Sequence, residues 1–363
     1  MFNIVASVFH NLLEPLTLVG HFNDFPPQDF SILKQLIDLP AFSGRFDLLT
    51  TMESDTRRTL EALPLSKLWR RFLYTETCFI GTTVTEYVLL PKETTPELLL
   101  HNIQANLIHR FPFLIIKDIP TESSLVGIPA YEYAKNLMHV CQDSGYVLIE
   151  GQALAYVRID FPTIDAYLSR LSRTRRKDLK RKLKSMMKLD IEIIHAGDAY
   201  FQDENVIAKF YELYLNVYQQ SNIHFDLLTE PFFRAILQDS CSRCIIFVYR
   251  ADNNIIGYNI CFVEGNMLMD KYVGFSYPKT REYNLYTVSW FCNLKYALDN
   301  GLQYYVAGWT DPEIKRNLGA KFTMTRHAVY VRNPILRILF RSLKRFFEAD
   351  HQWRSRNDPS NHS

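Results

Sequence analysis

The pattern of apolar and polar positions is clearest between residues 244 and 331, where it predicts alternating strands and helices. Three apolar runs separated by short polar turns predict strands at residues 244–250, 255–263 and 267–273. Apolar residues then recur at helical spacing over residues 283–299, and Gly301 ends that helix. The same criteria predict three later elements: a strand at 302–307, a short helix at 312–318 and a strand at 322–331. A three-strand antiparallel meander that crosses through a helix into an adjacent strand is an order that few folds use.

The first half of the chain also has a mixed α/β pattern, after a start over residues 1–60 that is predicted to be irregular. A long β pattern at residues 72–90 predicts a hairpin that turns near Ile80 and Gly81. Beyond it the pattern predicts a helix at 96–110, a strand at 113–118, a helix at 130–143, and strands at 146–149 and 155–161. A length of 363 residues favours two domains.

Residues ahead of the meander complete a longer order of elements. A strand is predicted at residues 191–195, followed by helices at 205–218 and 229–237, with Thr229 as the N-cap of the second. The second half therefore reads strand, two helices, three antiparallel strands, helix, strand, short helix, strand. This is the element order of the acyl-transferring GNAT fold.

Particular stretches also resemble GNAT-like proteins of the Fem type, which include aminoacyl transferases of cell-wall peptide synthesis and related acetyltransferase-like proteins. They are the run Asp270-Lys271-Tyr272-Val273-Gly274-Phe275-Ser276-Tyr277, the helix start Tyr283-Asn284-Leu285-Tyr286, the pattern Gly308…Lys315…Leu318-Gly319-Ala320, and the basic stretch from Arg173 to Lys184. The resemblance covers about residues 155–332. It implies an α/β (α+β) fold with a GNAT-like mixed, largely antiparallel sheet flanked by helices, in two tandem GNAT-like domains.

The resemblance also divides the chain. Residues 1–155 are expected to form a degenerate GNAT-like domain and residues 156–332 a GNAT-like catalytic domain. Residues 333–363 are expected to form a basic amphipathic helix and a disordered tail.

One loop departs from the usual GNAT pattern. Ordinary GNAT enzymes carry a glycine-rich pyrophosphate loop between the third meander strand and the crossover helix, whereas residues 274–282 here lack a second glycine. Lys279 and Arg281 beside the helix start could still attract a phosphate. The donor is therefore left open between acyl-CoA, aminoacyl-tRNA and an acyl carrier protein.

The resemblance implies a site where the third and fourth strands splay apart and expose backbone N–H groups to an acyl carbonyl. Asp270 is the candidate base, Tyr283 the donor of a proton to the leaving group, and Asn284 its neighbour at the helix start. The residues expected to bind substrate or donor are Lys271, Tyr272, Lys279, Arg281, Trp309 and Lys315. Strand alternation places Asp270 and Lys271 on opposite faces.

Purely structural interpretations of the same residues stay open. Asp270 and Lys271 could form a feature of a sheet edge, Tyr283 could be a packed aromatic residue, and Asn284 a helix cap. Lys315 could be a solvated helix lysine. Asp311 is expected to be a helix N-cap.

Charge adds two candidate docking surfaces. A basic helix is predicted at residues 164–187, and ten Lys or Arg but one acid, Asp178, lie between Arg170 and Lys188. It is either a solvated face or a surface for RNA, an acidic carrier protein or anionic lipid. A second basic amphipathic helix, at residues 335–348, either packs on the protein or lies on the inner membrane surface.

These features favour a bacterial, cytoplasmic N-acyltransferase, with a peripheral position at the inner membrane surface as an option. It would transfer an acyl or aminoacyl group to an amine on a small molecule, lipid or envelope precursor, by direct attack with backbone oxyanion stabilisation. The alternative is a non-catalytic GNAT-like module that docks on a carrier protein, RNA or membrane. No metal is expected, because the pair Cys241 and Cys244 has no second pair of ligands nearby.

Overall fold

The computed structural model describes residues 8–34, 39–47, 74–221, 225–344 and 348, and the chain divides into two compact units. The first unit consists of Met1–Leu12, Pro26–Ala153 and Thr323–Ser363. The second consists of Leu13–Phe25 and Leu154–Phe322. Each unit therefore takes in a segment of chain that lies far away in sequence from the rest of it.

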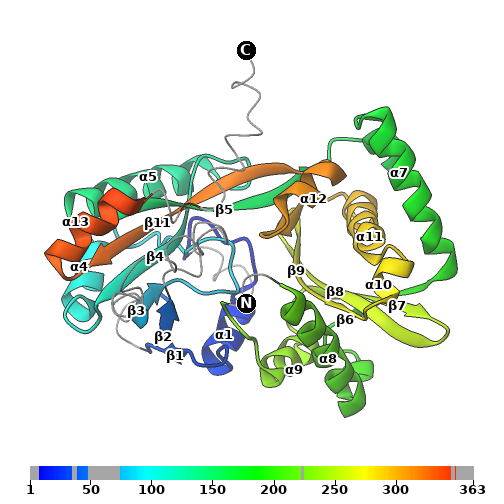
Figure 1. Ribbon diagram of the computed structural model, residues 1–363, viewed down its shortest axis with the longest axis horizontal. Coiled ribbons are helices and arrows are strands. Elements are labelled where there is room, and N and C mark those ends of the chain that lie inside the picture. The colour runs from blue at the N-terminus through cyan, green and yellow to red at the C-terminus, as the bar shows by residue number, and fades with distance from the viewer. Residues whose placement is uncertain (1–7, 35–38, 48–73, 222–224, 345–347, 349–363) are drawn as a thin grey trace, which may run out of the picture. The chain divides into compact units, whose positions relative to one another are not determined.

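The second unit is built on the predicted meander (Figure 1). Its antiparallel strands are β6 (Asp190–His195), β7 (Cys244–Ala251), β8 (Asn254–Glu264) and β9 (Met267–Phe275). β10 (Tyr304–Gly308) pairs in parallel with β9, and the end of β5 (Val147–Arg158) pairs antiparallel with β10. The sheet order in this unit is thus β5-β10-β9-β8-β7-β6.

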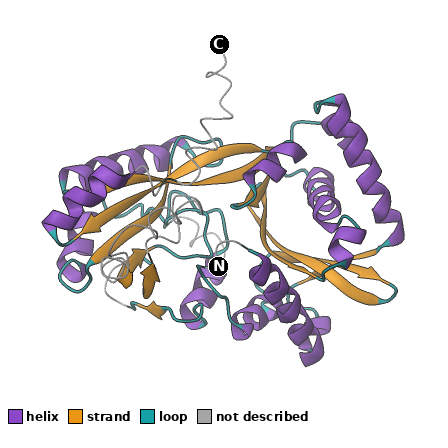
Figure 2. Cartoon of the chain, viewed as in Figure 1, coloured by secondary structure: helices purple, strands orange, loops and turns teal. Residues whose placement is uncertain are grey.

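Helices cover both faces of this sheet (Figure 2). The crossover helix α11 (Leu285–Asp299) packs into one apolar core with residues from α6 (Ile164–Ser169) and α7 (Arg173–Leu183). The opposite face is covered by α8 (Glu204–Gln220), α9 (Glu230–Gln238) and α1 (Leu16–Asp24). Aromatic pairs join that face to its helices, because the Tyr258 ring stacks on Phe210 at 4.3 Å and Tyr272 contacts Phe232 at 5.8 Å.

The first unit has the same succession of elements. A meander of β1 (Ser31–Ile32), β2 (Ala41–Asp47) and β3 (Tyr74–Ile80) leads through α4 (Pro96–Leu107) into β4 (Phe113–Pro120), which pairs in parallel with β3. The helix α5 (Ile128–Asp143) and β5 follow. In the second unit the corresponding elements are β7, β8, β9, α11, β10, the helix α12 (Pro312–Leu318) and β11 (Lys321–Val331). The predicted fold class of a mixed, largely antiparallel sheet with flanking helices is confirmed.

The last strand of each series is divided between the units. β5 begins in the first unit, and from Leu154 onward it belongs to the second, beside β10. From Thr323 onward β11 belongs to the first unit, where it pairs with β4 and is followed by α13 (Pro334–Leu343). The first unit's sheet order is accordingly β1-β2-β3-β4-β11-β5. The units thus differ from the contiguous ranges 1–155, 156–332 and 333–363 expected from the sequence.

Four local predictions are corrected. The two strands predicted at residues 146–149 and 155–161 are one continuous strand, β5. Residues 81–90 do not return as the second strand of a hairpin: they form an irregular, almost fully buried segment, while β3 pairs with β2 and β4. The basic helix predicted at 164–187 is broken into α6 and α7, because the Ser172 hydroxyl caps a new helix by accepting from Arg175 N–H. Residues 1–60 are not wholly irregular, since they contain α1, β1 and β2.

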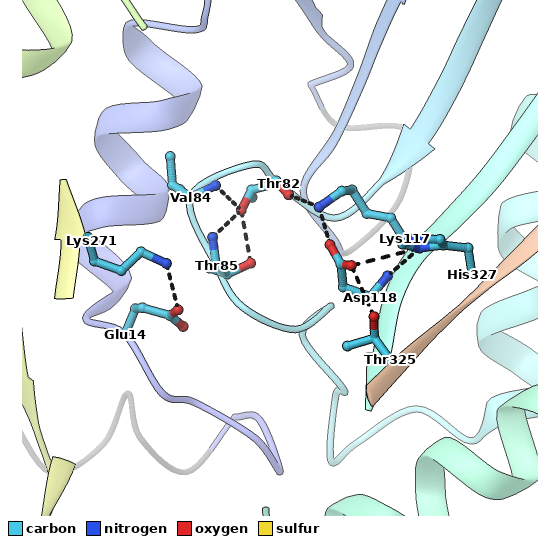
Figure 3. A network of polar contacts seen from close by, with 9 residues as sticks. All are labelled: Glu14, Thr82, Val84, Thr85, Lys117, Asp118, Lys271, Thr325 and His327. Carbon is cyan, nitrogen blue, oxygen red and sulfur yellow. Dashed lines mark hydrogen bonds and ion pairs between the residues drawn. The ribbon is translucent and has the colours of Figure 1, made fainter. Parts of the chain in front are cut away.

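A buried polar network lies where β3 and β4 stop pairing in the first unit (Figure 3). Two residues of β4, Lys117 and Asp118, face the single residue His327 of β11, and Asp118 has a positive φ of 55°. Lys117 donates to the carboxylate of Asp118 and, at 2.8 Å, to the carbonyl of Thr82. The backbone N–H of Asp118 donates to His327 Nδ1 at 2.9 Å, so these side chains brace an irregular point in the sheet.

Candidate active site

The candidate site lies where two parallel strands of the second unit separate. β9 and β10 pair at Met267–Tyr304, Leu268–Tyr305 and Met269–Val306, and their pairing ends there. Both strands are irregular just beyond that point. Lys271 is an extra residue in β9 relative to β8, and the register of β10 against β5 shifts between Val306 and Gly308. A bulge bends the strand that carries it, can end strand pairing and re-aims side chains.

Asp270 is the first residue of β9 beyond the paired segment. Its carboxylate accepts hydrogen bonds from three neighbouring elements: from Asn259 Nδ2 of β8 at 3.1 Å, Asn293 Nδ2 of α11 at 2.9 Å and Tyr305 Oη of β10 at 2.9 Å. A strand, a helix and a second strand are thereby tied to β9 at the point where its pairing with β10 ends. Asp270 therefore fixes the geometry of the point where the strands part.

The electrostatic environment of Asp270 pulls in two directions. Burial raises the pKa of its carboxyl group above 3.8, because the charged form loses hydration. The hydrogen bonds from Asn259 and Tyr305 and the charge of Lys315 oppose this and favour the carboxylate. The net direction is upward, which moves Asp270 toward the range in which a carboxylate accepts a proton readily.

Lys271 faces away from Asp270, as strand alternation predicts. Its ammonium group lies 3.2 Å from the carboxylate of Glu14 (Figure 3), and both side chains are buried. Tyr272 contacts α9 and so shares the face of Lys271, because the bulge interrupts the alternation between these two neighbours. Lys271 and Tyr272 are thus directed into the packing of this unit on the side opposite Asp270.

Lys315 of α12 is buried rather than solvated, with 6% of its surface exposed. Its ammonium group donates to the carbonyls of Gly308 at 3.2 Å and of Trp309, at the end of β10. Asp311 occupies the N-cap position of α12, but its side chain makes no capping hydrogen bond, contrary to expectation. Thr310 and Asp311 both have positive φ angles, of 65° and 47°, so the loop that Lys315 holds is a strained one.

The residues predicted around the crossover helix lie apart from this cluster. Tyr283 is partly exposed, and its ring lies 5.7 Å from the ammonium group of Lys279. Asn284 takes the N-cap position of α11 without a capping hydrogen bond and donates instead to Ser185 Oγ at 3.1 Å. Arg281 is exposed on the short helix α10 (Lys279–Glu282). Among the described residues, no hydrogen bond joins Tyr283 to Asp270.

Sequence reasoning missed three residues of the cluster. Asn259, Asn293 and Tyr305 hold the Asp270 carboxylate. Asn259 and Asn293 are 1% and 0% exposed. A signal was available, because an asparagine in the middle of an apolar strand or an apolar helix must find a buried polar partner.

The loop at the position of the usual pyrophosphate loop contains one glycine, Gly274, which packs closely against a buried aromatic ring. A Cβ on Gly274 would lie 2.2 Å from Cε1 of the buried Tyr258. Gly274 therefore lets β9 approach an aromatic ring, and residues 279–282 after it form α10. The described chain offers no glycine-rich cradle for a phosphate between β9 and α11.

The basic stretch is presented on the surface. On α7 the side chains of Arg173, Arg175 and Lys177 are exposed, and Leu179 packs into the core. Asp178 pairs with Arg181 and Lys182, and within the described residues Arg173, Arg175 and Arg176 form no ion pair with an acid. The first part of α7 therefore presents cations that no described acid pairs with, whereas Lys180, Arg181 and Lys182 further along pair with Asp165 or Asp178.

The chain between residues 8 and 348, its gaps aside, contains no group of three or more His, Cys, Asp and Glu side chains placed to hold a metal ion. None of the helices described is both long and apolar enough to cross a membrane.

Comparison with known proteins gives a family and a fold. Residues 102–356 match the FemAB-like family, described as peptidoglycan biosynthesis/recognition. No curated protein matches the chain in sequence. The predicted resemblance to Fem-type GNAT-like proteins is confirmed by this match.

Three solved structures share the fold of nearly the whole chain. The C-terminal domain of a putative lysylphosphatidylglycerol synthetase from Agrobacterium fabrum aligns with a TM-score of 0.54 and 12% identity, over 90% of each chain. L-PGS from Bacillus licheniformis aligns with a TM-score of 0.53 and 10% identity, over 93% of this chain and 98% of that one. FemX aligns with a TM-score of 0.52 and 12% identity, over 92% of this chain and 95% of that one.

Proposed function

Because this chain belongs to the FemAB-like family, we propose that it is an aminoacyltransferase that modifies an amine on an envelope precursor. The donor in this proposal is an aminoacyl-tRNA, and the activated carbonyl enters the opening between β9 and β10. The observation that carries the proposal is the end of strand pairing at Met269 and Val306, with Asp270 as the next residue of β9. An opening of this kind presents polar groups of the strands to a reacting carbonyl.

In the proposed reaction, an aminoacyl group moves from its ester bond with the tRNA to the acceptor amine, where it forms an amide. The neutral nitrogen of the acceptor attacks the ester carbonyl carbon, a C–N bond forms, and the C–O bond to the tRNA ribose breaks. The nitrogen loses one proton and the leaving ribose oxygen gains one. Asp270 is the candidate acceptor of that proton, since burial raises the pKa of its carboxyl group, and backbone N–H groups of β9 stabilise the oxyanion.

Two observations favour aminoacyl-tRNA over acyl-CoA as the donor. Gly274 is occupied by packing against Tyr258, so the loop before α11 lacks the glycines that close around a pyrophosphate. The exposed cationic face of α7 suits an RNA backbone. The name of one similar structure, a putative lysylphosphatidylglycerol synthetase, also refers to an aminoacyl group.

Lys279, Arg281 and Trp309 are proposed to contact the donor or acceptor at the rim of the opening.

The experiment is a transfer assay with the full chain. Labelled aminoacyl-tRNA or labelled acyl-CoA is supplied with amine-bearing envelope precursors, and formation of the amide is followed. We expect transfer from aminoacyl-tRNA, and we expect Asp270→Asn to lower kcat by about a hundredfold or more. Asp252→Asn is the matched control, because Asp252 lies in an exposed turn with a positive φ of 49° that asparagine also accepts. Equal turnover of the two variants would show that Asp270 takes no part in the reaction.

One observation favours a second function, that of a non-catalytic docking module. Three side chains of the protein already donate to the Asp270 carboxylate, and Lys271 is held by Glu14. In this alternative, Asp270 and Lys271 stabilise the fold and take no part in a reaction. In that case RNA binding by α7 would persist while no donor supports transfer, a result that the same assay distinguishes.

A further inference from the structure

We propose that α13 of the first unit is a docking helix for an anionic lipid surface. Its contact with the membrane is made by three exposed apolar side chains, Ile335, Ile338 and Leu339, which we call the outer strip. This proposal concerns binding alone and does not depend on the transfer reaction.

The inner side of α13 is already fixed to the protein. Phe340 is 7% exposed, and the guanidinium group of Arg337 stacks on the ring of Tyr330 at 4.1 Å and donates to the carbonyl of Val331 at 2.8 Å. The Asn333 side chain caps the helix by accepting from Ile335 N–H at 2.9 Å. Helix α13 is therefore held with a defined side turned outward, directly after β11 (Figure 1).

That outward side is apolar. The members of the outer strip are 76%, 69% and 53% exposed, in sequence order, and their spacing of three and four residues puts them on one stripe of the helix. Elsewhere in the described chain, no helix exposes more than one large apolar side chain to this extent: α4 exposes Leu98 and α5 exposes Ile128. A contiguous stripe, unlike a scattered residue, points to an interaction surface.

Charge identifies the occupant of this surface. Between Arg332 and Lys344 the sequence contains four basic residues, Arg332, Arg337, Arg341 and Lys344, and no acid. Arg332, Arg341 and Lys344 are exposed. An apolar stripe bordered by cations matches a bilayer surface in which acyl chains lie beneath anionic headgroups. Two copies of this face would repel each other, which disfavours a dimer as the occupant.

The test measures binding of the full chain to vesicles by co-sedimentation. Vesicles of equimolar phosphatidylcholine and phosphatidylglycerol are compared with vesicles of phosphatidylcholine alone. Glutamine replaces the outer strip in the variant Ile335→Gln/Ile338→Gln/Leu339→Gln, which keeps both helix propensity and net charge. Leu98→Gln/Ile128→Gln is the control, because it removes two apolar side chains of comparable exposure, 50% and 78%, from α4 and α5.

We expect the native chain and the control to bind the anionic vesicles, and the outer-strip variant to bind at least about tenfold more weakly. Arg341→Gln/Lys344→Gln should weaken binding to anionic vesicles and leave the weaker binding to phosphatidylcholine unchanged. Two results overturn the proposal. One is equal vesicle binding by the native chain and the outer-strip variant. The other is a concentration-dependent dimer in sedimentation velocity that only the outer-strip variant loses, with no vesicle binding.

Discussion

The ammonium group of Lys271 lies 3.2 Å from the carboxylate of Glu14, and 5% and 2% of the two side chains are exposed. Lys271 is the extra residue of the β9 bulge, and Glu14 lies just before α1. The pair therefore attaches the N-terminal segment of the second unit to the strand that carries Asp270. Each charge has lost its hydration, and their attraction offsets part of that cost.

Removing one partner of this pair should destabilise the fold strongly. We expect Lys271→Met or Glu14→Gln to lower the free energy of unfolding by about 3–5 kcal/mol, because the charge that remains stays buried and loses the attraction of its neighbour. The double variant Glu14→Leu/Lys271→Met should cost less than either single variant. Urea unfolding measures all three. Lys295→Met is the control: Lys295 pairs with Asp299 on the surface, so its loss should change the free energy by no more than about 0.5 kcal/mol.

The raised pKa of Asp270 predicts a pH dependence of stability with a definite sign. The folded protein holds the Asp270 proton more tightly than the unfolded chain does, so stability from this group is present below pH 3.8 and is lost as pH rises through the folded-state pKa. Asp270→Asn cannot lose that proton. The native chain should therefore lose stability relative to Asp270→Asn as pH increases, which urea unfolding at several pH values will show. A difference between them that stays constant with pH would contradict the assigned shift.

Gly274 should not accept a side chain. The Cβ of Gly274→Ala would lie 2.2 Å from the Tyr258 ring, and we expect a loss of about 1–3 kcal/mol as β9 or the ring is displaced. Gly20→Ala provides the contrast, because Gly20 lies within α1 with no atom within 4 Å of the added Cβ. It should raise stability by up to about 1 kcal/mol. Thermal unfolding compares the two, and equal effects would show that the contact with Tyr258 is not limiting.

The cationic face of α7 should bind RNA through phosphates. Arg173→Glu/Arg175→Glu/Arg176→Glu should weaken tRNA binding, and the slope of log affinity against log salt should fall by about one for each phosphate contact removed. Lys135→Glu/Lys295→Glu/Lys321→Glu reverses three exposed charges elsewhere and serves as the control. Filter binding over a salt series measures both. A parallel decline in the two triple variants would mean that net charge, not α7, governs the interaction.

Element order was predictable in the second unit because turn residues mark it clearly. Helix α12 has the predicted bounds, since Pro312 suits the first turn and Gly319 takes the positive φ that ends the helix. The break between α6 and α7 was missed because the basic residues continue through it. Only the capping hydroxyl of Ser172 marks the new start.

The candidate site was less predictable than the fold. Asp270 was identified from the resemblance. Asn259 and Asn293 stand out as polar residues in apolar segments, but the sequence does not show that their shared partner is Asp270, and Tyr305 has no such signal. The bulge at Lys271 has no sequence signal, so the shared face of Lys271 and Tyr272 could not be foreseen. Lys315 was placed correctly on α12, but its burial depends on carbonyls of a loop whose conformation periodicity does not report.

The division of β5 and β11 between the units bears on how the chain matures on the ribosome. The first unit lacks β11, the neighbour of β4, until the segment from Thr323 onward has been synthesised. Until then the edge of β4 that pairs with β11 stays without its partner strand, while the segment Leu154–Phe322 of the second unit is being synthesised. Neither unit is a continuous stretch of the chain. A protein truncated at any single position would therefore contain an incomplete sheet.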